Sequence, residues 1–170
     1  MGAVHTGLYV IMGVAGSGKT TIGAKLARAL GVAFVEGDDL HPAENVRRMA
    51  AGIPLTDGDR RPWLLAIAAR LRDAKRAGVG LVVSSSALKR SYRDLLRSEA
   101  QADVQLVYLK GSPKLIAERM AQRRGHFMPP ALLESQFATL EEPAPDEHAW
   151  VCDIRQPPGA IVAALVQRAA

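Results

Sequence analysis

Short apolar runs alternate with longer amphipathic stretches along this chain. The apolar runs are rich in β-branched and aromatic residues and predict five strands, at residues 8–12, 32–36, 79–84, 104–109 and 149–153. The amphipathic stretches predict helices over residues 20–30, 42–51, 60–77, 88–99, 112–124, 130–139 and 158–169. The strands lack strict polar–apolar alternation, as expected where helices cover both faces of a sheet. The pattern predicts an α/β fold, a mostly parallel five-stranded sheet flanked by helices, in one domain over residues 1–170.

A glycine-rich segment lies between the first predicted strand and the first predicted helix. It matches the phosphate-binding pattern G-x-x-x-x-G-K-[ST] and comprises Gly13, Val14, Ala15, Gly16, Ser17, Gly18, Lys19 and Thr20. The glycines let main-chain N–H groups turn inward around phosphate oxygens, and the helix start adds the positive end of its dipole. Lys19 would reach the outer phosphates, and the Thr20 hydroxyl would bind Mg²⁺. The spacing and the flanking elements disfavour the alternative, a turn that binds nothing.

The composition narrows the class of partner. Lys and Arg number 22 against 17 Asp and Glu, and this net charge of +5 suits anionic ligands such as nucleotide phosphates and a carboxylate. We expect no nucleic-acid partner, because aromatic residues form only 5% of the chain and no basic run is interleaved with them. No apolar run approaches the ~18 residues that cross a bilayer, and no secretory pattern opens the chain. With a single cysteine, these features predict a cytoplasmic protein and no membrane partner.

Polar residues follow the second and third predicted strands. Glu36, Asp38 and Asp39 come after the second strand, and residues 84–86 and Lys89 come after the third. Ligands of such a sheet gather at the carboxyl ends of its strands. Neither the third nor the fourth predicted strand ends in an acid, and no guanine-reading N-K-x-D sequence occurs, which disfavours a GTPase switch. The pattern favours a small kinase in which the acids after the second strand handle the metal and the acceptor.

A series of further motifs extends over essentially the whole chain. They are residues 37–42 (GDDLHP), 52–57 (GIPLTD), 59–64 (DRRPWL), 86–89 (SALK), 92–97 (YRDLLR), 108–111 (YLKG), 124–128 (RGHFM) and 136–141 (QFATLE). In this order they resemble the gluconokinase family, small P-loop kinases of the nucleoside-monophosphate-kinase-like type. The sequence departs from the family at two positions, because Glu36 stands where Asp is frequent and Ser85 where some members have Cys.

The resemblance implies transfer of the γ-phosphoryl group of ATP to the 6-hydroxyl of D-gluconate, with Mg²⁺ as cofactor. In that reading Lys19 and Arg123 act on the transferred group, and Thr20 and Asp38 hold the metal. Asp38 is also the candidate base for the acceptor hydroxyl, since it follows a strand beside the phosphate-binding loop. The alternative for Asp38 is a helix cap or a turn ahead of His41.

The acceptor needs hydrogen bonds and a cation for its carboxylate, and arginine suits a carboxylate best. The candidate residues are Asp38, His41, Arg47, Arg48, Lys89, Arg93 and His126. Arg47 and Arg48 cannot both face the acceptor, because adjacent helical residues point about 100° apart. For each arginine the alternative is a solvated helix face, and for His126 it is an ordinary loop position.

Residues 119–130 resemble a lid. Arg119 and Arg123 share a helical face and would reach the phosphates of ATP when the segment closes. Gln156 and Pro157 precede the last helix, where similar kinases border the adenine. For Trp63 and Trp150 we expect core packing. The family also implies a homodimer. Alternatives are a shikimate- or nucleotide-type kinase, or a nucleotide-binding module without transfer activity.

Overall fold

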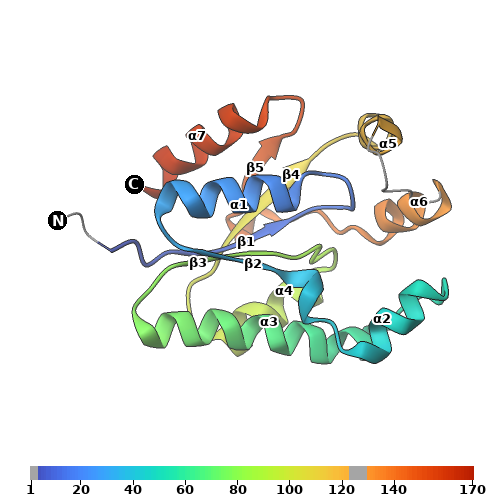
Figure 1. Ribbon diagram of the computed structural model, residues 1–170, viewed down its shortest axis with the longest axis horizontal. Helices are drawn as coiled ribbons and strands as arrows, with labels where there is room; N and C mark the ends of the chain where they lie inside the picture. Colours follow the sequence, from blue (N-terminus) through green and yellow to red (C-terminus); the bar gives the residue numbers. More distant parts are fainter. Residues whose placement is uncertain (1–3, 123–129) are drawn as a thin grey trace.

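The computed structural model describes residues 4–122 and 130–170 and confirms the predicted architecture. Its sheet has the order β2-β3-β1-β4-β5, and every neighbouring pair is parallel (Figure 1). The central position of β1 places the loop that follows it in the middle of the carboxyl edge. The strands are β1 (Leu8–Met12), β2 (Ala33–Glu36), β3 (Leu81–Ser84), β4 (Gln105–Lys110) and β5 (Trp150–Asp153).

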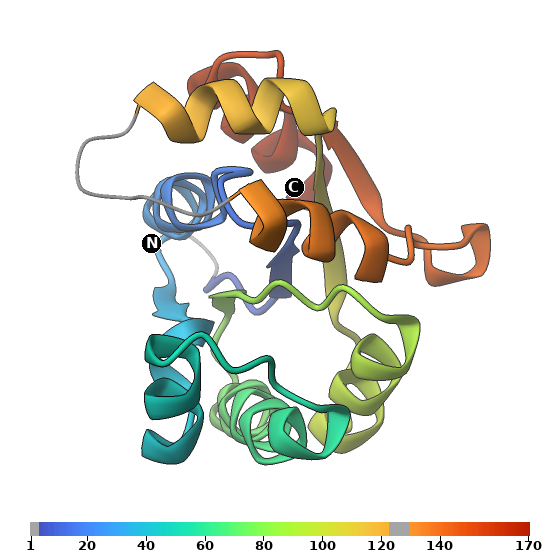
Figure 2. The ribbon, with the colours of Figure 1, turned by 90° about the vertical axis from the view of Figure 1, so that its right-hand side faces the viewer.

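Helices cover both faces of the sheet. One face carries α1 (Lys19–Leu30) and α7 (Pro158–Ala169), and the other carries α3 (Asp57–Ala77) and α4 (Arg90–Ala100) (Figure 1). Seen toward the carboxyl edge, α5 (Pro113–Gln122) and α6 (Pro130–Thr139) lie on the α1 side, and α2 (Ala43–Ala50) lies on the α3 side (Figure 2). Two short 3₁₀ helices, η1 (Gly37–Leu40) and η2 (Pro145–Glu147), complete the described elements.

Successive residues of each strand face opposite sides of the sheet and build two hydrophobic cores. Val10 and Val83 pack toward α3 and α4, in a cluster with Leu64. Ile11 and Val82 pack toward α1 and α7. Both sets are buried, which explains why the strands read as continuous apolar runs.

The boundary that differs most from its prediction is the start of α3. The helix begins at Asp57 rather than at residue 60, because Thr56 and Asp59 form a capping box. The Thr56 hydroxyl accepts a hydrogen bond from the Asp59 amide at 3.0 Å, and the Asp59 carboxylate accepts one from the Thr56 amide at 2.9 Å. This earlier start brings Asp57 to the carboxyl edge. The two 3₁₀ helices were not predicted either.

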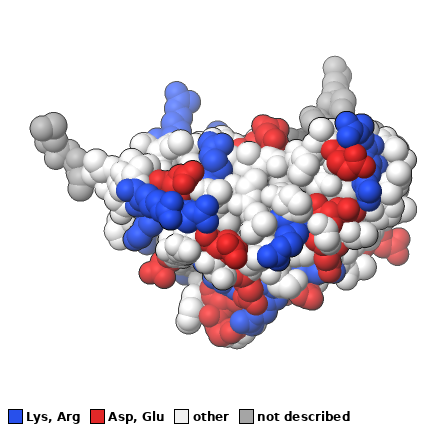
Figure 3. Space-filling model, turned by 90° about the horizontal axis from the view of Figure 1, so that it is seen from below, with Lys and Arg blue, Asp and Glu red and all other residues white. Residues whose placement is uncertain are grey.

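The surface below α3 mixes charges of both signs. Lys and Arg side chains stand among Asp and Glu side chains on this face and form no stripe of one sign (Figure 3). Within residues 4–122 and 130–170, no helix is both long enough and apolar enough to span a membrane.

Candidate active site

The phosphate-binding loop lies between β1 and α1, as predicted. Gly18, the N-cap of α1, has a φ of 99°, which a residue with a side chain rarely adopts. The Lys19 ammonium donates to the carbonyl oxygens of Gly13 and Val14, both at 3.0 Å, so it lies over the loop. Burial lowers the pKa of Lys19, while the nearby carboxylates of Asp38 and Glu36 act in the opposite direction. The charges that act on Lys19 thus come from the last residue of β2, Glu36, and from Asp38 in η1.

Glu36 ends β2 and contacts the phosphate-binding loop directly. Its carboxylate accepts hydrogen bonds from the Thr20 hydroxyl and, at 2.6 Å, from the Ser84 hydroxyl. Ser84 is paired with Glu36 in the parallel register of β2 and β3. The sequence analysis named Thr20 and Asp38 as the metal residues, and the structure adds Glu36 as the carboxylate that pairs with Thr20. The available signal was the position of an acid at the carboxyl end of a strand of the same sheet.

Asp38 lies in η1, immediately after Glu36 and Gly37. It is exposed, and its charge favours the protonated form of both Lys19 and His41 and acts to raise the pKa of each, against the larger effect of burial. The residue at the N-cap of η1 is Glu36, and its side chain makes no capping hydrogen bond. Asp38 is therefore not the cap of this helix, although its carbonyl accepts a bond from the His41 amide at 3.3 Å.

Lys89 belongs to a polar cluster formed where α3 and α4 begin. Its ammonium donates to the Asp57 carboxylate at 3.0 Å, and the Tyr92 hydroxyl donates to the same carboxylate. Arg60 donates to the Tyr92 oxygen at 3.0 Å. These hydrogen bonds, from Tyr92 first and then from Lys89, lower the pKa of Asp57. Asp57, Arg60 and Tyr92 join Lys89 at the site, although the sequence analysis did not select them.

The two adjacent arginines of α2 both pair with Glu44, but they differ in exposure and in their further partners. Arg47 pairs with Glu44 at 2.8 Å, and 71% of its side chain is exposed. Arg48 pairs with Glu44 at 3.4 Å and with Asp59 at 3.1 Å, so it leans toward the start of α3. Only Arg48 is turned toward the cluster at the beginning of α3.

Arg93 is the candidate substrate residue that the structure places elsewhere. Its guanidinium is fully buried and pairs with Glu147, with Nε–Oε1 at 2.7 Å and Nη2–Oε2 at 3.0 Å. It also donates to the Ala87 carbonyl at 2.9 Å. Burial alone would raise the pKa of Glu147, but the Arg93 hydrogen bonds and the Ala144 amide lower it to about 2. The prediction of substrate binding is corrected: this guanidinium joins α4 to η2 instead of facing a ligand.

Residues predicted for the nucleotide come from α5 and from the loop after β5. The Arg119 guanidinium donates to the Ile154 carbonyl, which brings it beside the loop that contains Gln156 and Pro157. Arg123 and His126 lie outside the described residues. The structure adds one contact that the sequence did not suggest, since the Gln136 side chain on α6 accepts a hydrogen bond from the Ala15 amide at 2.6 Å.

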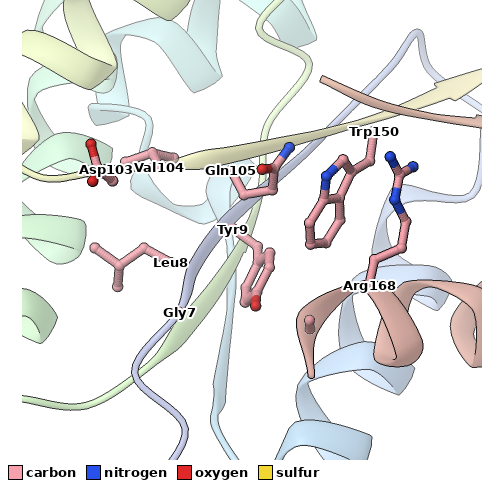
Figure 4. A pocket seen from close by; sticks show the side chains of 9 residues that line it. Gly7, Leu8, Tyr9, Asp103, Val104, Gln105, Trp150 and Arg168 are labelled. Atoms are coloured by element: carbon pink, nitrogen blue, oxygen red, sulfur yellow. The ribbon is translucent and has the colours of Figure 1, made fainter. Parts of the chain in front are cut away.

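A shallow cavity of about 270 Å³ lies at the opposite edge of the sheet. Figure 4 shows Tyr9, Gln105 and Trp150 around it, at the amino ends of β1, β4 and β5, with Arg168 beside the Trp150 ring. The phosphate-binding loop follows the carboxyl end of β1, so this cavity is separate from the candidate active site.

Comparisons with known proteins find matches over most of this chain. A family model described as an AAA domain matches residues 8–143. The chain is 51% identical to a gluconokinase of Gluconobacter oxydans (strain 621H), over 81% of this chain and 77% of that protein. It is 50% identical to the thermosensitive gluconokinase of Escherichia coli (strain K12), over 82% of this chain and 74% of that protein. The crystal structure of a gluconokinase from Sinorhizobium meliloti 1021 superposes with a TM-score of 0.87 at 48% identity, covering 98% of this chain and 95% of that one.

Proposed function

The chain belongs to the gluconokinase family, and we propose that it transfers the γ-phosphoryl group of ATP to the 6-hydroxyl of D-gluconate to give 6-phosphogluconate. The observation that carries this proposal is the complete phosphate-binding loop with the Lys19 ammonium over it, and the charge of Asp38 acts on that ammonium. Phosphoryl transfer is catalysed mainly by positioning and by neutralising charge on the transferred group. An ammonium facing the phosphates and a carboxylate facing the alcohol meet both needs.

The two groups divide the work. Lys19 and the loop amides hold the β- and γ-phosphate oxygens. Asp38 accepts the proton of the 6-hydroxyl of gluconate. The oxygen of that hydroxyl bonds to the γ-phosphorus while the bond from the γ-phosphorus to the β–γ bridging oxygen breaks. The products are 6-phosphogluconate and ADP. The exposed position of Asp38 supports this role, since the side chain is open to an acceptor.

The residues around Thr20 fit Mg²⁺. Thr20 and Glu36 offer oxygen atoms only as ligands. Such a site suits Mg²⁺, which proteins usually hold by one or two side chains together with substrate phosphates. When bound, the ion would neutralise charge on the β- and γ-phosphates. We assign Thr20 and Glu36 to it, with Asp38 as the third candidate.

We assign the acceptor end to three residues: His41, which follows η1, Lys89, the N-cap residue of α4, and Arg48 on α2. Arg47 is left out because its guanidinium is exposed and paired with Glu44. Roles in ATP binding for Arg119, Arg123, Gln156 and Pro157 stay predictions, as do a contact of His126 with the substrate and closure of residues 119–130. A homodimer and a cytoplasmic location also stay predictions.

The proposal is tested by measuring ADP release with Mg·ATP over a panel of gluconate, shikimate and AMP. We expect turnover with gluconate and none above the ATPase background with the other two. Turnover with shikimate or AMP instead of gluconate would reassign the acceptor. A folded protein that binds ATP but turns over none of the three would be a nucleotide-binding module.

A further inference from the structure

Trp63 is more than a core residue. Its side chain is buried in α3, 2% exposed, as its aromatic character predicts. Its indole Nε1–H, however, donates a hydrogen bond to the carbonyl oxygen of Gly37 at 2.8 Å. Gly37 separates Glu36 from Asp38, so this single bond from α3 reaches the segment that carries both acids of the site.

The main chain at Gly37 is held from the β3 side as well. The Gly37 amide donates to the Ser84 hydroxyl at 3.2 Å. A Cβ atom at position 37 would lie only 1.9 Å from the Ser84 carbonyl oxygen, so the backbone is already packed against β3. The Trp63 indole holds the Gly37 carbonyl from the α3 side. Without this hydrogen bond Gly37 would keep only its bond to Ser84, and Glu36 and Asp38 would be free to shift.

The Trp63 ring also supports His41. The two rings stack with centroids 4.3 Å apart and planes 13° apart. His41 Nδ1 lies 3.2 Å from the Asn45 amide nitrogen, which also donates to the Asp59 carbonyl at 2.8 Å. Since an amide nitrogen can only donate, Nδ1 is the acceptor, and a neutral imidazole carries its proton on Nε2. His41 can therefore donate the Nε2–H to a hydroxyl of the substrate.

We propose that Trp63 is a positioning residue of the acceptor site, which fixes Asp38 through the Gly37 carbonyl and His41 through ring stacking. This inference rests on the proposed function, because it assigns Trp63 to the site that binds the alcohol. It gives one buried side chain control over two groups that the proposed function assigns to the acceptor.

The first test compares Trp63→Phe with Trp150→Phe. Phenylalanine keeps a ring at position 63 and removes the N–H that reaches Gly37. We expect the kcat with gluconate to fall roughly 10- to 100-fold, since small misplacements of reacting groups have effects of this size, while the KM for ATP stays within about twofold. Trp150 contacts Tyr9 and Arg168 at the far edge of the sheet, so Trp150→Phe should keep the parent kcat.

A second measurement covers the case in which Trp63→Phe does not fold. The chain has two tryptophans, so Trp63 is the sole indole in Trp150→Phe. Its fluorescence should titrate with His41 at a midpoint below 6.5, because burial lowers the pKa of His41, and His41→Gln should abolish the titration. Gluconate should move the midpoint, whereas shikimate should not.

The outcomes separate the inference from the proposed function. If the parent enzyme turns over gluconate and folded Trp63→Phe keeps its kcat, the inference is wrong and the function stands. If the parent enzyme turns over gluconate but saturating gluconate does not move the midpoint of the Trp63 fluorescence titration, the inference is wrong in the same way. If the parent does not turn over gluconate at all, the proposed function is what fails.

Discussion

The side-chain oxygen of Gln136 accepts a hydrogen bond from the main-chain amide of Ala15 at 2.6 Å. This contact joins α6 to the phosphate-binding loop across 121 positions of sequence. On the same loop, a Cβ at Gly16 would lie 2.6 Å from the Met120 side chain of α5, so this helix also packs directly on the loop. Both α5 and α6, whose facing ends belong to the predicted lid, thus contact the phosphate-binding loop.

Gln136→Leu should weaken ATP binding. It removes the acceptor of the Ala15 amide, and a hydrogen bond of this kind contributes about 1 kcal/mol. We therefore expect a KM for ATP raised about fivefold, with a smaller change in kcat, measured by steady-state kinetics at saturating gluconate. Ser135→Ala is the matched control, since Ser135 is an exposed neighbour on the same helix. A parent-like KM in Gln136→Leu would mean that this contact does not shape the nucleotide site.

Asp38→Asn should slow the chemical step far more than it weakens ATP binding. The amide cannot take the proton of the acceptor hydroxyl, and loss of a general base typically costs 10²- to 10⁴-fold in rate. The measurement is kcat together with the Kd for ATP by calorimetry. Asp39→Asn provides the control, because Asp39 is the next residue of η1 and is also exposed. Equal losses in the two variants would argue for a general effect of charge.

Glu36→Gln should raise the Mg²⁺ concentration needed for half-maximal activity. Thr20 and Ser84 donate to different oxygens of Glu36, so the amide keeps an acceptor for only one of them, and it removes the negative charge beside the expected ion. We expect a shift of roughly tenfold, read from titrations with Mg²⁺ at constant ATP. Glu36→Asp, which restores the residue frequent in the family, should stay near the parent. Removal of Mg²⁺ with EDTA should abolish turnover in all three proteins.

Glu147→Gln should destabilise the fold, because it leaves the buried Arg93 guanidinium without its counter-charge. Breaking one partner of a buried pair typically costs about 3–5 kcal/mol in the free energy of unfolding. The folded-state pKa of Glu147 is about 2, below its ordinary 4.5, so its stabilising contribution is complete above pH 4.5 and is lost as the pH falls toward 2.

Denaturant unfolding of both proteins between pH 7 and pH 2 measures this effect. The difference in unfolding free energy between parent and Glu147→Gln should be largest near pH 7 and should shrink below pH 4.5. Glu141→Gln, in the same connecting segment, is the control. A difference that stays constant down to pH 2 would show that the Glu147 charge is not what stabilises the fold.

The sequence predicted features whose cause is local. The phosphate-binding loop needs only its own eight residues and the flanking strand and helix, so it was found directly. The five strands followed from short apolar runs. The earlier start of α3 had a signal too, because Thr56 and Asp59 have the spacing of a capping box.

What the sequence could not predict are pairings between distant segments. Arg93 reads as one more helical arginine until Glu147 is brought against it from 54 positions away. The same holds for Thr20 with Glu36, which meet because β2 lies beside β3 and the loop after β1 reaches toward them. Trp63 was correctly expected in the core, but its hydrogen bond to Gly37 depends on how α3 crosses the sheet.

The sheet order has a consequence for how this enzyme can diversify. Because β1 lies in the middle, the groups assigned to the acceptor all come from residues 36–92, and those predicted to meet the nucleotide beyond the loop come from residues 119–157. In these assignments the residues for the alcohol and those for ATP come from two separate stretches of the chain, and the one exception is His126, a predicted substrate contact within the second stretch. Exchanging residues 36–92 between relatives would therefore change the preference for the alcohol and leave the predicted ATP-binding residues as they are.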